Sequence, residues 1–296
     1  MKILISGENS QLGNEFKKLI TNQTEHNFFF TNSKTMDLMN KNSIEKTILE
    51  VMPDIIVNFS GYTNVDGAED NKDDAFSINE IAPGLISKIS SSIGANFIHI
   101  STDYVFGGQD KGPYNTEALA DPINIYGNSK LNGEVSVLKN CPKSIIIRTS
   151  SIFSVYNDNF VKTITNKLIN NESINVVDNQ KINITYAKDL SEAILTLIIF
   201  NKLEYIFENN PKRIINYTNT GYTSWYEVAC HIKSCLSGDL GEVLAINSKE
   251  WSSRAKRPND SRLMIDYGLF KFLNIELFDW KNRVSGVVGE LISNRN

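Results

Sequence analysis

The chain has 296 residues, of which 41% are hydrophobic and 22% charged, and its formal net charge at pH 7 is −4. This length and composition are typical of a globular protein with one or two domains, and they exclude a collagen-like, coiled-coil or largely disordered chain. The slightly acidic balance and the absence of long basic runs argue against nucleic acids and membrane surfaces as partners.

Several features of the sequence concern the compartment. The longest strongly apolar stretch, residues 194–200, is far shorter than the roughly 20 residues that a transmembrane helix needs. The first residues are too few and too polar for a secretory signal. The 3 cysteines show neither C-x-x-C nor zinc spacing, and the 3 histidines are isolated in the sequence. We expect a cytoplasmic protein without disulfides or a metal site.

In the first half, short β-branched runs alternate with longer helical patterns, which is typical of βα units that build a parallel sheet. The runs at 55–57 and 145–147 are continuously apolar, as in strands covered on both faces. We expect strands at residues 2–6, 28–31, 55–59, 96–101 and 144–149, and helices at about 11–21, 43–51, 72–92 and 126–140.

After residue 150 the pattern loosens into connections rich in Asn and Ser, with helices near 159–169 and 190–200 and a strand near 174–177. We therefore predict an α/β fold of two parts. Residues 1–150, with contributions from later segments, would form a doubly wound parallel sheet of the Rossmann type that binds a dinucleotide. Residues 151–296 would mainly form a smaller, interleaved α/β lobe that binds the substrate.

A turn rich in small residues directly follows the first predicted strand. It reads Ser-Gly-Glu-Asn-Ser-Gln-Leu-Gly over residues 6–13 and leads into a helix. Small residues such as Gly7 and Gly13 let the backbone approach a pyrophosphate, and the helix N-terminus favours its negative charge. Ser10 replaces the middle glycine of a G-x-x-G-x-x-G pattern. Its Cβ would hinder the approach, or its hydroxyl would donate to a phosphate.

The end of the second predicted strand bears on the choice of cofactor. An acidic residue that binds the adenosine ribose of NAD is expected there, but residues 31–34 read Thr-Asn-Ser-Lys. A carboxylate would repel the 2′-phosphate of NADPH, whereas Ser33 and Lys34 are able to bind it. The sequence favours NADPH, with NADH as the alternative.

The chemical centre is predicted from Tyr126 and Lys130, which lie four residues apart at the start of a helix and so project from one face. A nearby ammonium stabilises a phenolate and lowers the pKa of a tyrosine, which suits a general acid and base. Thr102 lies at the end of the fourth predicted strand, where parallel sheets bind ligands, and its hydroxyl is able to hold a substrate carbonyl.

These motifs together resemble the extended short-chain dehydrogenase/reductases and, within them, the dTDP-4-dehydrorhamnose reductases. The resemblance covers nearly the whole chain, at residues 7–13, 58–69, 100–106, 126–134, 148–150, 159–162, 257–258 and 261–263. It implies that Thr102, Tyr126 and Lys130 form the catalytic triad, and that Asn79 is a helix asparagine that supports the active-site backbone.

The resemblance and the turn together give two sets of binding residues. The cofactor set is Gly7, Ser10, Gln11, Leu12, Gly13, Ser33, Lys34, Ser60, Gly61, Tyr62, Asn79 and Lys130. The substrate set, for a nucleotide-diphosphate sugar, is Tyr104, Ser151, Asn159, Lys162 and Arg257.

Arg148 lies in the fifth predicted strand, and Ser151 follows that strand. Arg148 lies inside an apolar strand, so we predict that it pairs with a buried carboxylate rather than with a ligand. Members of the family usually read Thr-Ser-Trp after this strand, whereas this chain has Ser151 in place of the tryptophan. Either the site accepts a bulkier or differently substituted sugar, or Phe153 fills the space.

The implied activity is NADPH-dependent reduction of the 4-keto group of a nucleotide-linked 6-deoxy sugar, with dTDP-4-dehydro-L-rhamnose as the first candidate, in the synthesis of surface polysaccharide precursors. A sugar epimerase or 4,6-dehydratase is an alternative, but Tyr104 stands where such dehydratases carry a glutamate. A non-catalytic regulatory subunit is a further alternative, supported only by Ser10 and Ser151. We expect a monomer or a homodimer.

Overall fold

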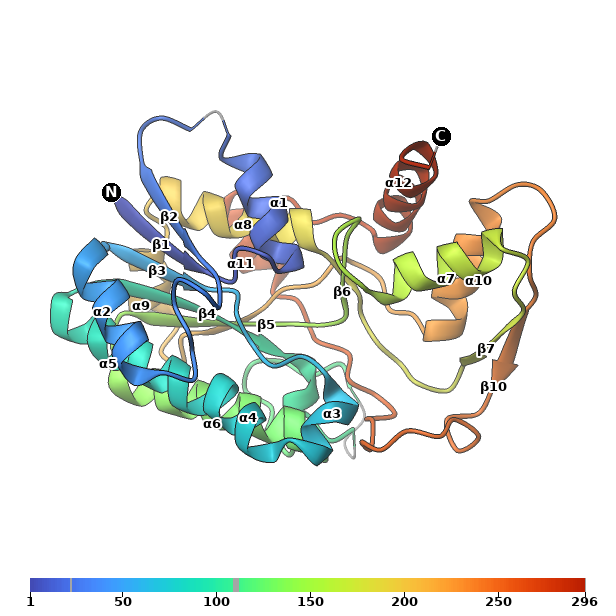
Figure 1. Cartoon of the computed structure of the whole chain (residues 1–296), viewed down its shortest axis with the longest axis horizontal. Coiled ribbons are helices and arrows are strands. Elements are labelled where there is room, and N and C mark those ends of the chain that lie inside the picture. The colour runs from blue at the N-terminus through green and yellow to red at the C-terminus, as the bar shows by residue number, and fades with distance from the viewer. Residues whose placement is uncertain (22, 109–111, 296) are drawn as a thin grey trace.

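The computed structural model describes residues 1–21, 23–108 and 112–295. A parallel sheet of six strands in the order β2-β1-β3-β4-β5-β9 forms its centre (Figure 1). The strands are β1 (Lys2–Ser6), β2 (Asn27–Thr31), β3 (Ile55–Asn58), β4 (Asn96–Thr102), β5 (Ser144–Thr149) and β9 (Ile214–Asn216).

Helices cover both faces of this sheet because successive side chains of a strand point to opposite sides. Ile56 and Ile146 pack with one set of helices, while Ile55 and Ile147 pack with the other. The first set is α2 (Lys41–Val51), α5 (Ala82–Ile93) and α6 (Ile125–Asn140); the second is α1 (Gln11–Leu19), α8 (Ala187–Ile199), α9 (Leu203–Asn209) and α11 (Tyr267–Leu273). The predicted doubly wound α/β fold is confirmed.

Two helical segments between β3 and β4 differ from the prediction. The helix expected at 72–92 consists of α4 (Lys72–Phe76), a π-helical turn η1 (Ser77–Ile81) and α5. A short helix, α3 (Val65–Asp70), precedes it and was not predicted, because six residues are too few to show an amphipathic period. The π turn adds a residue to one helical turn, and its one buried residue is Asn79.

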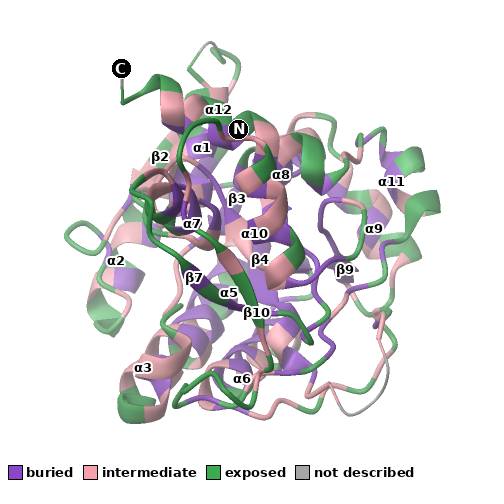
Figure 2. Cartoon of the chain, turned by 90° about the vertical axis from the view of Figure 1, so that its right-hand side faces the viewer, coloured by how far each residue is buried: buried purple, intermediate pink, exposed green. Residues whose placement is uncertain are grey.

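A second apolar cluster lies beside the sheet, with Leu168, Val228 and Trp280 among its buried members. Its elements lie to the right in Figure 1, and Figure 2, which faces that side, shows exposed residues along β10 and buried strands of the main sheet behind it. They are α7 (Phe160–Ile169), α10 (Trp225–Ser234), α12 (Trp280–Ser293), the parallel pair β7 (Ile174–Val177) and β10 (Val243–Ile246), and the parallel pair β6 (Ile152–Phe153) and β8 (Thr185–Tyr186).

Segments after residue 150 also return to the main sheet. The strand β9 pairs with β5, with Ile215 opposite Ile147. The helix α8 lies against α1, where the Ser191 hydroxyl donates to the Leu12 carbonyl at 3.3 Å. In the part of the chain that the structure describes, no helix is long and apolar enough to span a bilayer.

Glu15 on α1 is a carboxyl group in this helix layer, only 2% exposed, and burial raises its pKa to about 7. The raised pKa means that the folded state binds the Glu15 proton more tightly than the unfolded chain does. The protonated carboxyl therefore contributes fully to the free energy of unfolding below about pH 4.5, and this contribution is lost as the pH rises through about 7. We expect Glu15→Gln to raise the free energy of unfolding by about 2 to 3 kcal/mol at pH 8 and to leave it unchanged at pH 4.

Urea denaturation at the two pH values tests this expectation. Glu50→Gln on the exposed face of α2 is the matched control and should change the stability little at either pH. Equal effects of Glu15→Gln at pH 4 and pH 8 would contradict the expectation.

Candidate active site

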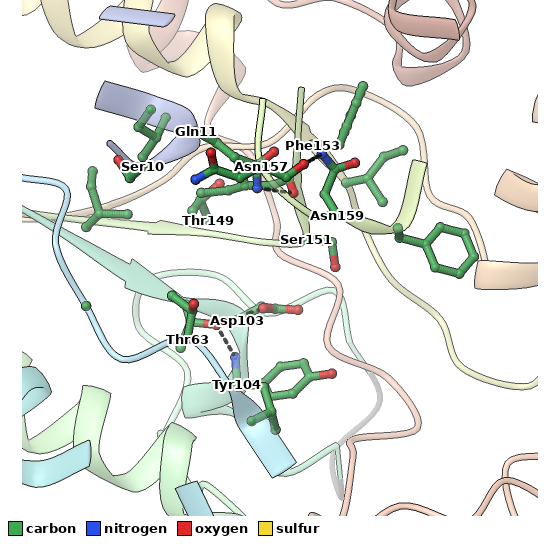
Figure 3. A pocket seen from close by; sticks show the side chains of 18 of the residues that line it. Ser10, Gln11, Thr63, Asp103, Tyr104, Thr149, Ser151, Phe153, Asn157 and Asn159 are labelled. Atoms are coloured by element: carbon green, nitrogen blue, oxygen red, sulfur yellow. Dashed lines mark hydrogen bonds between the residues drawn. The ribbon is translucent and has the colours of Figure 1, made fainter. Parts of the chain in front are cut away.

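A cavity of about 610 Å³ opens at the carboxyl ends of β1, β3, β4 and β5. The strand order places β2 and β3 on opposite sides of β1, so the chain reverses direction across the sheet at this edge, which is where open α/β sheets bind ligands. Figure 3 shows Ser10 and Gln11 on one side of the cavity and Asp103 and Tyr104 on the other.

The turn after β1 has the geometry of a phosphate-binding loop. Gly7 has φ of +86°, and a Cβ on Gly13 would lie 2.2 Å from the Gly7 carbonyl oxygen, so both positions need glycine. The Ser10 hydroxyl accepts the Gly13 N–H at 3.0 Å and so caps α1. Ser10, Gln11 and Leu12 line the cavity at the first helical turn, whose N–H groups lack intrahelical acceptors and suit a pyrophosphate.

The segment after β5 closes over this turn. The Gln11 side chain donates to the Ile152 carbonyl at 3.2 Å and accepts from the Ser154 hydroxyl at 2.9 Å. The Asn157 amide donates to the Asn9 carbonyl at 2.8 Å. Asn157 and Asp158 line the cavity and were not predicted, because no motif links two loops that lie so far apart in the sequence.

The loop that follows β2 lies apart from the residues lining the cavity, and Ser33 and Lys34 in it are exposed. Ser33 and Lys34 follow Asn32, whose side-chain oxygen accepts the Lys34 N–H at 2.9 Å. The Asn32 amide donates to the Glu8 carboxylate at 3.0 Å, and Glu8 also pairs with Lys17 at 2.7 Å. A carboxylate is therefore present beside the end of β2, but it comes from the loop after β1 and not from residues 31–34.

The loop after β3 is held in place by Asn79. Its side chain accepts the Tyr62 N–H at 2.9 Å and donates to the Tyr62 carbonyl at 3.0 Å and to the Ser129 hydroxyl at 3.0 Å. Ser60 and Gly61 from this loop line the cavity, whereas Asn79 is fully buried behind it. Asn79 thus positions the loop through its backbone, which is the supporting role that the resemblance implies.

The hydroxyl groups expected to do the chemistry lie together. Thr102, Tyr104 and Tyr126 all line the cavity, and the two tyrosine rings meet edge to face with centroids 5.9 Å apart. The Thr102 hydroxyl accepts the Tyr104 N–H at 3.2 Å and donates to the Asp103 carboxylate at 3.1 Å. Burial raises the pKa of Tyr126 to about 12, and its hydrogen bond with Thr102 lowers it in part.

Lys130 lines the same cavity but is oriented differently from the expectation. Its amine donates to the Ile100 carbonyl at 2.6 Å, and burial lowers its pKa to about 8, partly offset by Glu134. Lys130 is not among the groups that shift the pKa of Tyr126. The spacing predicted a lowered pKa for Tyr126, whereas burial raises it.

Asp103 is a buried carboxyl group that the sequence analysis did not single out. It accepts from the Ser150 hydroxyl at 2.9 Å and from the Ser261 hydroxyl at 2.6 Å, and burial raises its pKa to about 6. These bonds tie the end of β4 to β5 and to the C-terminal segment. The only sequence signal was its place directly after Thr102.

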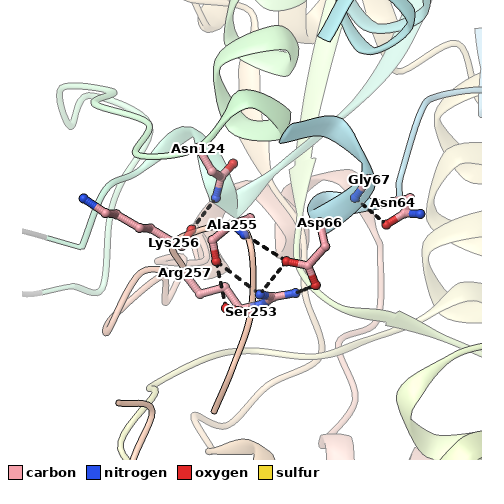
Figure 4. A network of polar contacts seen from close by, with 8 residues as sticks. All are labelled: Asn64, Asp66, Gly67, Asn124, Ser253, Ala255, Lys256 and Arg257. Atoms are coloured by element: carbon pink, nitrogen blue, oxygen red, sulfur yellow. Dashed lines mark hydrogen bonds and ion pairs between the residues drawn. The ribbon is translucent and has the colours of Figure 1, made fainter. Parts of the chain in front are cut away.

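The residues predicted to hold the substrate do not all reach the cavity. Arg257 lines it and pairs with Asp66 at 2.9 Å, as Figure 4 shows. Ser151 and Asn159 also line it, although the Asn159 side chain already caps α7 by accepting the Lys162 N–H at 3.1 Å. Among the described residues, those lining this cavity and its neighbour do not include Lys162, so its assignment to the substrate stays a prediction.

A neighbouring cavity of about 740 Å³ shares Phe160, Trp225 and Arg257 with the first. The Phe160 and Trp225 rings lie 4.6 Å apart and form an aromatic wall between α7 and α10. Trp251 also lines this second cavity. The cavity was not predicted, because no motif in the sequence marks a pocket between these helices. Within the described ranges, no group of three or more His, Cys, Asp or Glu residues is able to hold a metal ion.

Comparison with known proteins places the chain in one family. The family model described as "RmlD substrate binding domain" matches residues 1–292. The spore coat polysaccharide biosynthesis protein SpsK of Bacillus subtilis is 34% identical over 257 residues, which are 87% of each chain. The dTDP-4-dehydrorhamnose reductase of Sinorhizobium fredii is 31% identical over 295 residues, 99% of this chain and 98% of that one.

A solved structure shows the same fold. The dTDP-4-dehydrorhamnose reductase of Bacillus anthracis, in complex with NADP, is 31% identical with a TM-score of 0.86, covering 98% of this chain and 99% of that one. Since the family model spans nearly the whole sequence, this chain belongs to the RmlD substrate binding domain family.

Proposed function

We propose that the protein is an NADPH-dependent reductase that converts the 4-keto group of dTDP-4-dehydro-L-rhamnose into the alcohol of dTDP-L-rhamnose, for surface polysaccharide synthesis. The observation that carries the proposal is the meeting of Thr102, Tyr126 and Lys130 in one cavity with a phosphate-binding turn. The names of the relatives support it. Within this proposal residues 1–150, with later segments, hold the cofactor, and residues 151–296 mainly hold the sugar nucleotide.

The protein's contribution to the reaction is orientation and proton supply. The nicotinamide cofactor, when bound along the turn at Ser10 to Leu12, supplies the hydride. The Thr102 hydroxyl would turn its proton from Asp103 to the carbonyl oxygen of the sugar and hold it there. The Tyr126 phenol is protonated at neutral pH because its pKa is about 12, and it gives its proton to the oxygen as negative charge develops there. Lys130, which lines the same cavity, would hold the ribose of the nicotinamide.

The two adjoining cavities suit the two ends of a sugar nucleotide. The sugar would lie near Tyr126 in the first cavity, and the nucleoside would enter the second past the Phe160 and Trp225 rings. Arg257 lines both and offers its guanidinium to the pyrophosphate between them. These aromatic rings line the same cavity as Ser151, the position at which family members usually carry tryptophan.

The exposed Lys34 supports NADPH as the cofactor, since a cation there is able to pair with the 2′-phosphate. The nearby Glu8 carboxylate is already paired with Lys17 at 2.7 Å, which offsets its negative charge. We expect Lys34→Glu to lower the ratio of kcat/KM for NADPH over NADH by about tenfold or more, as the new carboxylate would repel this group. Steady-state kinetics with both cofactors measure the ratio. Lys41→Glu makes the same charge change at the exposed start of α2 and should leave the ratio unchanged.

Arg257 gives a second test of the substrate site. We expect Arg257→Gln to raise KM for the sugar nucleotide by about tenfold to a hundredfold, since a charged hydrogen bond contributes about 1.5 to 3 kcal/mol. The KM for NADPH should change little. Arg254→Gln, which removes the exposed partner of Asp70, is the matched control. Equal KM values for the two variants would exclude Arg257 from the pyrophosphate site.

A coupled assay with a panel of 4-keto-6-deoxy nucleotide sugars tests the function directly. NADPH consumption in a one-to-one ratio with product distinguishes a reductase from an epimerase or dehydratase, which recycles its NAD. Identification of the product sugar decides whether Ser151 has changed the substrate. NADPH binding without oxidation by any member of the panel would refute the proposal. We also propose a cytoplasmic location. We further propose that the protein is a monomer or a homodimer, and sedimentation measurements on the full chain distinguish these two states.

A further inference from the structure

A chain of buried polar side chains lies behind the cavity and ends at Lys130. Ser6 at the end of β1 donates to the Asn58 side-chain oxygen at 2.5 Å, and the Asn58 amide nitrogen lies 3.0 Å from Nδ1 of His99. His99 Nε2 lies 3.4 Å from the Lys130 amine. Asn58 and His99 are both fully buried, in β3 and β4. Neither residue has a part in the mechanism described above.

The backbone sets the direction of the hydrogen bonds between these side chains. The Asn58 side-chain oxygen accepts the Ser60 N–H at 3.0 Å, so the nitrogen of the same amide must face His99. An amide nitrogen only donates, and therefore Nδ1 of His99 accepts and carries no proton. Full burial of the His99 side chain keeps its pKa well below the usual value, so the ring is neutral. A neutral ring carries one proton, which must lie on Nε2.

The Nε2–H of His99 faces the Lys130 amine. An ammonium group has three N–H donors and no lone pair, so a charged Lys130 would place a donor against a donor. An uncharged amine has a lone pair that is able to accept the Nε2–H, while it still donates to the Ile100 carbonyl. The fixed tautomer thus matches the neutral form of Lys130 better than the charged form.

We propose that His99 is a positioning residue of this site: Asn58 directs its Nε2–H toward Lys130, which favours the uncharged amine in the free protein, and Lys130 takes up a proton as ligands enter the cavity. The inference rests on the proposed function only for the last step, because bound phosphates and hydroxyl groups would favour the ammonium form.

The titratable side chains of Glu134 and His99 act on the Lys130 amine. Glu134, one turn further along α6, raises the pKa of Lys130, but this carboxylate is paired with Arg148 of β5 at 2.6 Å. From β4, His99 faces the amine at 3.4 Å. A Cβ on Gly61, in the loop after β3, would lie 3.9 Å from the amine. The opposing influences are therefore Glu134 on one side and burial with the His99 donor on the other.

Nuclear magnetic resonance of the full-length, cofactor-free protein tests the tautomer. With 15N-labelled histidine, three-bond correlations distinguish a protonated Nε2 from a protonated Nδ1, and the chain has only 3 histidines to assign. We expect His99 to show a bare Nδ1 and a protonated Nε2 throughout the pH range in which the protein is folded. A proton on Nδ1 would overturn the proposal without any variant being needed.

The ionisation of Lys130 is measured with 13Cε-labelled lysine, its signal being identified by its loss in Lys130→Met. We expect His99→Gln to raise the pH of this transition by about one unit or more, because the glutamine oxygen is free to face the ammonium. Asn58→Asp should raise it too, because a carboxylate accepts a hydrogen bond from a protonated Nδ1, and this tautomer leaves the Nε2 lone pair facing Lys130. His26→Gln at an exposed position should have no effect.

The activity readout separates the two proposals. If the protein is a reductase, the alkaline limb of kcat/KM against pH should move upward in His99→Gln by the shift that the lysine signal shows. An inactive wild-type protein with the predicted lysine shift would refute the proposed function alone. An active protein whose Lys130 transition is the same in wild type, His99→Gln and Asn58→Asp would refute the role of His99 alone.

Discussion

Replacement of Tyr126 by phenylalanine should reduce NADPH oxidation by about a hundredfold to ten-thousandfold, the range in which a positioned general acid contributes. The hydroxyl group is the only part of the side chain that the change removes, and with it the proton and the hydrogen bond to Thr102 are lost. Thr102 keeps its bonds to Asp103 and Tyr104 in the variant. Single-turnover kinetics with saturating cofactor and sugar measure the effect.

Two controls make the Tyr126→Phe result interpretable. Cofactor binding, followed by fluorescence titration with NADPH, should remain within a few-fold of wild type because the turn at Ser10 does not contact the phenol. Tyr267→Phe, at a residue that is 60% exposed, should keep full activity. If Tyr126→Phe retained full activity, the protonation role would be excluded; a protein that is inactive in both forms would point to the regulatory-subunit alternative.

Replacement of Arg148 by methionine should lower the free energy of unfolding by about 3 to 5 kcal/mol. Arg148 donates to both oxygens of Glu134 at 2.9 and 2.6 Å, and the side chains are only 4% and 2% exposed. This contact confirms the predicted buried carboxylate partner. Without the guanidinium, Glu134 would be left as an unpaired charge in the interior, which is the source of the large cost. Urea denaturation at pH 7 measures it.

The double variant Glu134→Leu with Arg148→Met distinguishes a lost charge partner from lost packing. Removing both charges takes away the unpaired carboxylate, so the double variant should be more stable than Arg148→Met alone. Lys46→Met, which breaks an exposed pair with Glu50 on α2, should change stability by less than about 1 kcal/mol. A double variant less stable than the single one would show that packing dominates.

The sequence was most informative where one local pattern decides the structure. The strand at 144–149 has the predicted bounds, because a continuous β-branched run leaves no other choice. Thr102, Tyr126 and Lys130 meet because a strand end and a helix start are both visible as patterns and both lie at the carboxyl edge of the sheet.

Contacts between distant segments could not be predicted in this way. Asp103 binds Ser261 across 158 positions, and no periodicity or spacing encodes that bond. The strand β9 has three residues, too few to separate from a loop, although it extends the main sheet. The direction of the Lys130 amine depends on the Ile100 carbonyl and on burial, neither of which a Y-x-x-x-K spacing contains.

The first 150 residues depend for their packing on α8 and β9, which come from later in the chain and return to the main sheet. A fragment ending at residue 150 would lose the strand that pairs with β5, leaving a row of open hydrogen-bonding groups, and would uncover the apolar side of α1. Exposed edges and faces of this kind promote aggregation. We expect such a fragment to be recovered from inclusion bodies, and a useful truncation must keep the chain through α11.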